Sequence, residues 1–350
     1  MIGLATAAGP VLGGLILALA TGPDSWRWVF FVNVPIGIVT LLLAARIIPA
    51  GSRRRWHDLD LDLDLDLDLV GSILLGATVV AVLLPVVEID SGGLGRLWVL
   101  WPLAALLVPL FVRWEQRVVR RGRQPLLDPR LVPTPGYSWG VGIGTVYFLG
   151  FTGIWLVFAL FLQDGLGYSP LRSGLTVTPF ALGVAVSAVI AGRLVSPIGR
   201  WLTVYGLAAT IGGLLVTALV LRDSTRPGTQ WAVLVPLLVA GLGGGMVTSP
   251  NMTLTLQNVP VSMAGAAGGA VQTAQRIGAS IGLATLATIY YNVLLGTHDY
   301  PTAISHALLA AAGIMTLALL MALAELARRR QRRDREAPIR ARPEEHVYHV

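Results

Sequence analysis

Few ionisable side chains lie close to the apolar segments of this 350-residue chain. A proton relay inside a membrane needs buried ionisable groups. No aspartate or glutamate lies near the middle of an apolar segment, and this holds for Glu88, Glu115, Asp164 and Glu325. Each of them stands near an end of an apolar segment, where we expect water to solvate the carboxylate. The sequence therefore shows no candidate for a proton-coupling residue.

Residue types that support metal binding or enzyme catalysis are missing or scattered. The chain has no cysteine, and its five histidines are spread over loops, a helix start and the tail. They are His57, His298, His306, His346 and His349. Neither a glycine-rich phosphate loop nor a nucleophile elbow occurs. We therefore expect no metal or other cofactor, and an enzyme embedded in the membrane is disfavoured.

The composition indicates lipid rather than water as the surroundings of the chain. Apolar residues make up 54%, charged residues 13%, and the mean hydropathy is +0.69. A soluble domain carries about twice that charged fraction. The net charge of +7 and the pI near 10.3 could suit nucleic acid. The arginines, however, sit between apolar segments, a distribution that fits membrane orientation and predicts no nucleic-acid partner.

A helix that spans a bilayer needs about 20 mostly apolar residues. By this measure the sequence predicts an all-α integral membrane protein of about ten transmembrane helices. The expected spans are 2–21, 28–48, 69–87, 97–114, 138–162, 173–192, 201–221, 231–249, 265–292 and 304–325. The stretches Ser249-Pro250-Asn251 and Asn258-Val259-Pro260 are expected to break the long uncharged run between the eighth and ninth spans.

The arginines predict the orientation of these spans. Of the 26 basic residues, all arginine, 20 lie in alternate connections and in the tail, and five in the opposite connections. By the positive-inside rule the richer side is cytoplasmic, so the C-terminus is expected in the cytosol.

A small-residue face marks the first span. Ala5, Gly9 and Gly13 lie four residues apart, which lets another helix approach closely. Pro10 removes a backbone hydrogen bond and loosens the helix there. Gly14 completes the pattern Gly-Pro-x-x-Gly-Gly. Such a face has two equally good physical explanations. One is ordinary tight packing of membrane helices, and the other is a joint between two parts of the protein that move.

This pattern resembles the antiporter motif of drug:proton exporters of the major facilitator superfamily. The string from Trp26 to Gly37 resembles the entry to the sixth helix of the fourteen-helix members. Further matches are 125–128, 161–163, 167–174, the turn at 259–260 and the glycine-rich helix after 265. The resemblance implies a partial major facilitator fold. Residues 1–48 would be the last two helices of the N-terminal half and 49–130 a linker with two extra helices. Residues 131–326 would be a complete six-helix C-terminal half, and 327–350 a basic cytoplasmic tail.

The same resemblance implies that about four helices are missing at the N-terminus, with the proton-coupling acid of the family. We therefore expect the chain by itself not to transport. Normal export of a fluorescent dye from cells expressing these 350 residues alone would contradict this. The alternative function is that of an inactive or structural fragment of a truncated transporter gene.

A second resemblance lies in the connection 192–200, which is similar to the C-terminal copy of a cytoplasmic loop motif. Its matching residues are Gly192, Leu194, Gly199 and Arg200. Ser196 stands where the family has an acid, which puts a charge-based latch in doubt. A plain basic loop explains the segment equally well.

Two more sets of residues carry expectations. The small face Gly183, Ser187 and Ala191 is predicted to pack against Ala5, Gly9 and Gly13, joining the two halves. A substrate cavity is expected between the halves, near the middle of the membrane. Its candidate lining residues are Asn33, Tyr147, Trp155, Phe158, Phe161, Gln272, Gln275 and Arg276. The aromatic residues could equally face lipid, and Arg276 could extend to the interface.

The resemblance thus implies export of lipophilic or cationic small molecules in exchange for protons, across the cytoplasmic membrane of a bacterium. Besides substrate and protons, the lipid bilayer is the expected partner, and the sequence does not define an oligomeric state. The alternating Asp-Leu tract at 58–68 is interpreted as a linker, because it lacks the glycine and ligand spacing of a calcium loop.

Overall fold

The computed structural model describes residues 2–20, 22, 24–47, 68–88, 93–123, 125–222 and 229–340. Within these ranges the chain is helical and contains no β-strand, as the sequence predicts. The longer helices are α1 (Ile2–Leu19), α3 (Asn33–Ile47), α4 (Leu69–Val87), α6 (Leu100–Arg120), α7 (Tyr137–Leu160), α8 (Pro170–Ile198), α9 (Arg200–Arg222), α11 (Leu234–Leu256), α12 (Ala264–Thr297) and α13 (Tyr300–Arg340). Short helices are α2 (Trp28–Phe31), α5 (Gly93–Arg96) and α10 (Thr229–Ala232).

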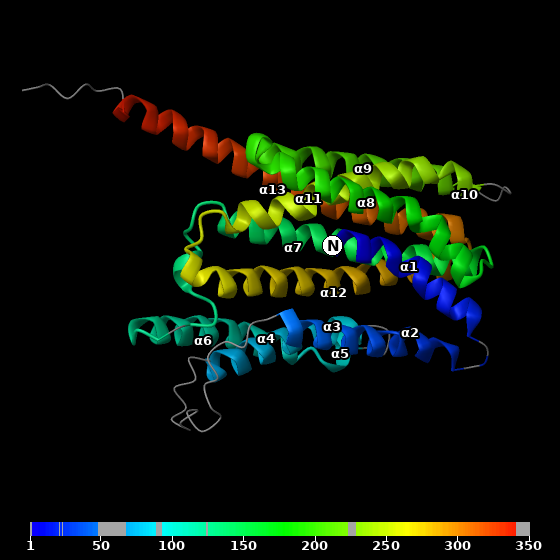
Figure 1. The fold of residues 1–350 in the computed structure, drawn as a ribbon, viewed down its shortest axis with the longest axis horizontal. Helices are drawn as coiled ribbons and strands as arrows, with labels where there is room; N and C mark the ends of the chain where they lie inside the picture. Colours follow the sequence, from blue (N-terminus) through cyan, green and yellow to red (C-terminus); the bar gives the residue numbers. More distant parts are fainter. Residues whose placement is uncertain are drawn as a thin grey trace, which may run out of the picture.

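Helices α7, α8, α9, α11, α12 and α13 pack into one bundle (Figure 1). Helix α11 contacts α8 and α9, α12 contacts α7, and α13 contacts both α7 and α9. The core is fully buried and mostly apolar. Among its largest side chains are Tyr147, Phe161, Leu207, Leu237, Leu286 and Ile304. We call the end where α7, α9 and α12 begin the arginine-rich end, since Arg193, Arg200 and Arg328–Arg330 lie there.

The helices before residue 123 attach to this bundle in two places. Helix α1 packs on α8, while α4 pairs with α6 and contacts α12 on the side away from α9 (Figure 1). Helices α2 and α3 hold no buried residue. Many large apolar side chains face outward, including Leu41, Ile73 and Leu106. Such continuous apolar surface is what a lipid environment covers.

Among the described residues, eight helical stretches are long and apolar enough to cross a membrane. They are Ser25–Ile47, Leu69–Val87, Tyr137–Gly165, Pro170–Ile198, Arg200–Arg222, Leu234–Leu256, Val261–Thr297 and Tyr300–Gln331. The expected spans 2–21 and 97–114 correspond to α1 and α6. Charged side chains, from Arg113 onward, fill the second half of α6. The expected break at Ser249-Pro250-Asn251 is wrong, because α11 continues through Pro250 to Leu256. The expected break at Asn258-Val259-Pro260 is confirmed, because it lies between the end of α11 and the start of α12 at Ala264.

Glycines set the closest contacts between helices, but not in the predicted pairing. A Cβ placed on Gly183 would lie 2.7 Å from backbone atoms of Leu238 and Leu242, and one on Gly245 would meet Ser187. The small face of α8 therefore packs against α11, with Ala191 also buried. The sequence shows small faces but not their partners, and glycine-rich α11 matches α8 better than α1 does.

Helix α1 does lie on α8, as expected of the two helices, but through a different residue. A Cβ on Gly14 would lie 2.7 Å from the Leu171 Cα and 2.8 Å from the Pro170 carbonyl oxygen, at the start of α8. A Cβ on Gly9 or Gly13 would meet nothing within 4 Å. The side chains of Ala5 and Pro10 lie outside what the structure describes.

This contact gives a matched pair of substitutions. Gly14→Ala should lower the stability of the purified chain by about 1–3 kcal/mol, because the added methyl group has no room against α8. Gly13→Ala should be neutral or slightly stabilising, since its methyl group meets open space and alanine favours helix by about 1 kcal/mol. Thermal denaturation in detergent measures both. Equal denaturation midpoints for the two variants would contradict the α1–α8 contact.

Candidate functional site

The turn between α8 and α9 places one arginine inside the bundle. Gly199 has φ +61° and ψ −139°, a backbone conformation that L side chains rarely adopt, and its N–H donates to the Val195 carbonyl at 2.8 Å. The chain then re-enters a helix at once, so Arg200 is the first residue of α9. Gly192 and Leu194 of the same motif are exposed. The buried part of the motif is thus Arg200.

Arg200 forms a buried ion pair with Glu325 of α13. The Arg200 Nε lies 2.7 Å from the Glu325 Oε2, and the two side chains are 1% and 2% exposed. The expectation that Glu325 is solvated is wrong. Helix α13 continues to Arg340 instead of ending near residue 325, so Glu325 lies within the helix and faces α9. Although Ser196 supplies no acid in this motif, an acid from another helix pairs with Arg200.

Two further residues extend this pair into a charged network of Arg200, Asn251, Glu325 and Arg329. The Arg200 Nη1 donates to the Asn251 Oδ1 at 2.6 Å, and the Asn251 Nδ2 donates to the Gly140 carbonyl at 2.9 Å. The Arg329 Nε donates to the Glu325 Oε1 at 2.9 Å. The network connects α7, α9, α11 and α13. The Arg200 Nη2 has no hydrogen-bond partner among the described residues.

One predicted polar residue of α12 reaches the same region. Gln275 is 8% exposed. A Cβ placed on Gly144 would lie 2.9 Å from the Asn251 Nδ2 and 3.1 Å from the Gln275 Nε2. Gln275 and the charged network therefore meet at α7. Gln272 and Arg276, on the same helix, are exposed, so the structure does not bring them into the interior.

The predicted aromatic lining residues divide between core and surface. Tyr147, Phe158 and Phe161 are at most 3% exposed and belong to the core, with the Tyr147 hydroxyl donating to the Gly244 carbonyl at 3.4 Å. Trp155 is half-buried. It joins an aromatic cluster, with ring centroids 5.1–6.4 Å apart between neighbours. The members of this aromatic cluster are Tyr147, Phe148, Phe151, Trp155 and Phe180.

The remaining lining candidate, Asn33, lies apart from these residues. It is exposed on α3, and its Nδ2 donates to the Val29 carbonyl at 3.3 Å. Phe148, which the sequence did not single out, is half-buried, and Phe148 and Trp155 both contact the Phe151 ring. Residues 148 and 155 are seven apart, which puts them on one face of α7. Both rings are thus partly exposed, whereas Gln275 is buried.

Asn251 is a residue of the charged network that the sequence alone does not identify, since the sequence places it in an expected break between spans. An asparagine in a long apolar run is costly without hydrogen-bond partners, and that cost was the available signal. Among the described residues, no three His, Cys, Asp or Glu side chains gather where they could hold a metal ion.

Comparison with known proteins adds to this geometry. Residues 1–283 of the chain match the protein family described as the Major Facilitator Superfamily. The probable actinorhodin transporter of Streptomyces coelicolor is 32% identical over 300 residues, 84% of this chain and 50% of that protein. The cephamycin export protein CmcT of Amycolatopsis lactamdurans is 33% identical over 290 residues, 81% and 56% of the two chains. The puromycin resistance protein pur8 of Streptomyces alboniger is 33% identical over 299 residues, 82% and 55%. The chain spans about half the length of these curated relatives.

Proposed function

Because the chain belongs to the major facilitator superfamily, we propose that it acts in the export of lipophilic or cationic small molecules, in exchange for protons, across the bacterial cytoplasmic membrane. The observation that carries this proposal is its match with relatives named for the transport of, or resistance to, actinorhodin, cephamycin and puromycin. These names belong to those proteins, and the substrate of this chain is part of the proposal.

The proposal includes the fourteen-helix group and its topology. Helix α1 and the segment α2–α3 would belong to the N-terminal half, α4 and α6 would be the two extra helices, and α7 to α13 the C-terminal half. The arginine-rich end and the C-terminus would face the cytosol. The six-helix bundle from α7 to α13 and the contact of α1 with α8 support this assignment.

The charged network suggests how export is controlled. Buried charges are costly without their partners, so Arg200 and Glu325 hold α9 and α13 together as long as the arginine-rich end is closed. If this end opens and Arg200 and Glu325 separate, each side chain needs water or a new partner to compensate its charge. The network would therefore act as a latch between two arrangements of the bundle, while Trp155 and Phe148 offer aromatic surface to a lipophilic cation.

Export is tested in cells that express the chain together with the four preceding helices of a relative such as pur8, because these 350 residues alone are expected not to transport. We expect ethidium to leave these cells faster than cells without the gene, and a protonophore to stop the export while ATP is maintained. Trp155→Ala should lower the rate at least twofold. Trp201→Ala removes a tryptophan that is exposed on α9 and stacks on Tyr205, and should leave the rate unchanged. Ethidium retention equal to that of cells without the gene would contradict the proposal.

A further inference from the structure

A cavity of about 720 Å³ lies at the arginine-rich end, between α4, the segment 125–132 and the first turns of α7 and α12. Sites for drug-sized ligands are roughly 300–1,000 Å³ in volume and mostly apolar. The wall of this cavity is built largely of apolar and small residues, among them Leu75, Leu126, Leu131, Val141, Ala270 and Ile277. Ser138, Gly265 and Gly269 also line it and are exposed, so the cavity opens to its surroundings.

Two carboxylates line this cavity, and they differ in their partners. Asp128 is held by Arg130, whose Nη2 lies 2.6 Å from the Asp128 Oδ2. Asp68 instead accepts hydrogen bonds from the Gly71 N–H at 2.7 Å and from the Trp114 Nε1 at 2.7 Å. In the part of the chain that the structure describes, no arginine pairs with Asp68. Among the described residues, therefore, Asp68 is the carboxylate of this cavity without a cationic partner.

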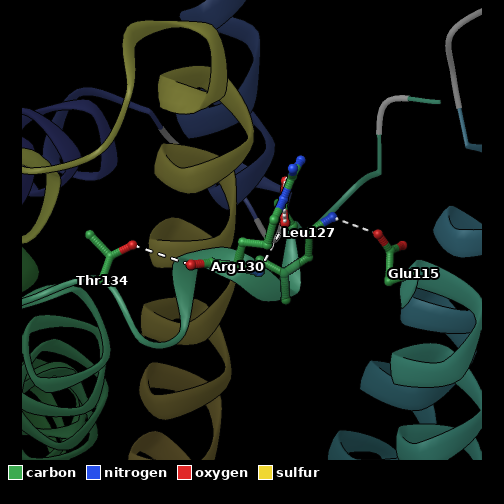
Figure 2. A network of polar contacts seen from close by, with 5 residues as sticks. Glu115, Leu127, Arg130 and Thr134 are labelled. Atoms are coloured by element: carbon green, nitrogen blue, oxygen red, sulfur yellow. Dashed lines mark hydrogen bonds and ion pairs between the residues drawn. The ribbon is translucent and has the colours of Figure 1, made fainter. Parts of the chain in front are cut away.

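Glu115 of α6 lies against Asp68 and is 1% exposed. Its Oε2 accepts a hydrogen bond from the Leu127 N–H at 3.0 Å, as Figure 2 shows. Its Oε1 has no hydrogen-bond partner among the described residues. The two carboxylates converge at Gly71, where an added Cβ would meet Asp68 and lie 2.6 Å from the Glu115 Oε1. A buried acceptor without a donor costs free energy. We therefore expect the Glu115 Oε1 either to carry a proton or to lie near a cation.

Of these two alternatives, a proton on Glu115 agrees with its burial. Burial raises the pKa of Glu115 to about 7, and the negative charge of Asp68 adds to the rise. Asp68 is the N-cap residue of α4 and accepts hydrogen bonds from the Gly71 N–H and the Trp114 Nε1. Other ionisable groups on the surrounding elements are exposed or already bonded. They are Arg113 and Arg117 of α6, the Asp128–Arg130 pair, Tyr137 bonded to the Ala267 carbonyl, and Arg276 of α12.

We propose that this cavity binds a lipophilic cation, with its positive charge against Asp68 and its apolar body along α7 and α12, and that Glu115 releases its proton to water as the cation binds. The bound cation then takes the place of the proton, and its positive charge compensates the ionised carboxylate of Glu115. This site goes beyond the proposed function, because it uses α4 and α6 and none of the residues of the aromatic cluster or the charged network. It can bind whether or not the chain transports.

The probe is tetraphenylphosphonium, a permanent lipophilic cation that does not itself titrate. Its binding to the purified chain in detergent is measured by calorimetry between pH 6 and pH 8. We expect the affinity to rise severalfold over this range, as Glu115 loses its proton with a pKa of about 7. Up to about half a proton should be released per bound cation at pH 7, since a group titrating near 7 is half-protonated there. The neutral triphenylphosphine oxide should bind at least tenfold more weakly.

Three variants and one control decide the assignment. Asp68→Asn should weaken binding at least tenfold, while Glu115→Gln should keep binding but abolish its pH dependence and proton release. Gly269→Leu should block the cavity without strain, because an added Cβ there meets nothing within 4 Å. Glu88→Gln removes an exposed carboxylate at the other end of α4 and should change nothing.

Binding that is undetectable, or that is equally tight in Asp68→Asn, Gly269→Leu and the unmodified chain, would overturn the site. Failure of dye export in cells would leave it standing. Export with unchanged binding in these variants would support the proposed function and refute this cavity.

Discussion

Glu325→Gln is expected to destabilise the chain by about 3–5 kcal/mol, the usual effect of leaving one member of a buried ion pair without its partner. The side chain keeps its shape but loses its charge, so Arg200 stays cationic at 1% exposure with nothing to neutralise it. Arg329, which also pairs with Glu325, is left nearby with the same sign. Denaturation by SDS in mixed micelles, followed by tryptophan fluorescence, measures the change.

Two comparisons make this prediction specific. Asp164→Asn neutralises an exposed carboxylate at the end of α7 and should shift the transition little. The double variant Arg200→Gln/Glu325→Gln should be more stable than the sum of the two single changes predicts, because it leaves neither member of the buried pair charged, and Arg329 is 42% exposed to solvent. A Glu325→Gln transition within error of that of Asp164→Asn would show that the pair contributes nothing to the folded state.

Gly282→Val is expected to disrupt the packing of α12 on α7. A Cβ on Gly282 would overlap the Leu149 carbonyl oxygen, which belongs to the α7 backbone and cannot turn away as a side chain could. One on Gly278, a turn earlier, would meet the Thr145 carbonyl oxygen in the same way. Overpacking of a core typically costs about 1–3 kcal/mol. We expect a cost at or above the upper end, because a rigid helix must move.

The matched control for Gly282→Val is Gly296→Val on the same helix, where an added Cβ meets nothing within 4 Å. It carries the same loss of glycine and the same gain of a branched side chain. The yield of folded chain after detergent extraction and the thermal denaturation midpoint measure both variants. Equal behaviour of the two would mean that α7 and α12 do not touch at Gly282.

Much of the architecture could be predicted from the sequence because lipid imposes a simple rule. A spanning segment must satisfy its backbone internally and expose apolar side chains, so length and composition locate helices such as α4, whose predicted bounds 69–87 agree with Leu69–Val87. Helix ends were less predictable. Glycines and prolines inside a membrane helix do not stop it when neighbours pack against it, as Pro250 in α11 shows.

The candidate site was harder to predict, because burial of a charge depends on a partner distant in sequence. Glu325 and Glu115 were interpreted as solvated from their position near span ends, yet both are at most 2% exposed. Arg200 and Glu325 are 125 residues apart and meet only because α9 and α13 pack together. Asp68 ends the tract that is interpreted from the sequence as a linker. In the structure it accepts a hydrogen bond from Trp114 and lies against Glu115, both on α6.

By itself, then, the sequence determined that the chain is helical, which segments are apolar enough for a bilayer, and which family motifs it carries, since these depend on local composition and spacing. Only the tertiary structure decided which small faces meet, which aromatic rings are core, and which acids lose water. Those properties arise from contacts between helices, and the free energy of a glycine, a ring or a carboxylate is set by the neighbour that the fold places against it.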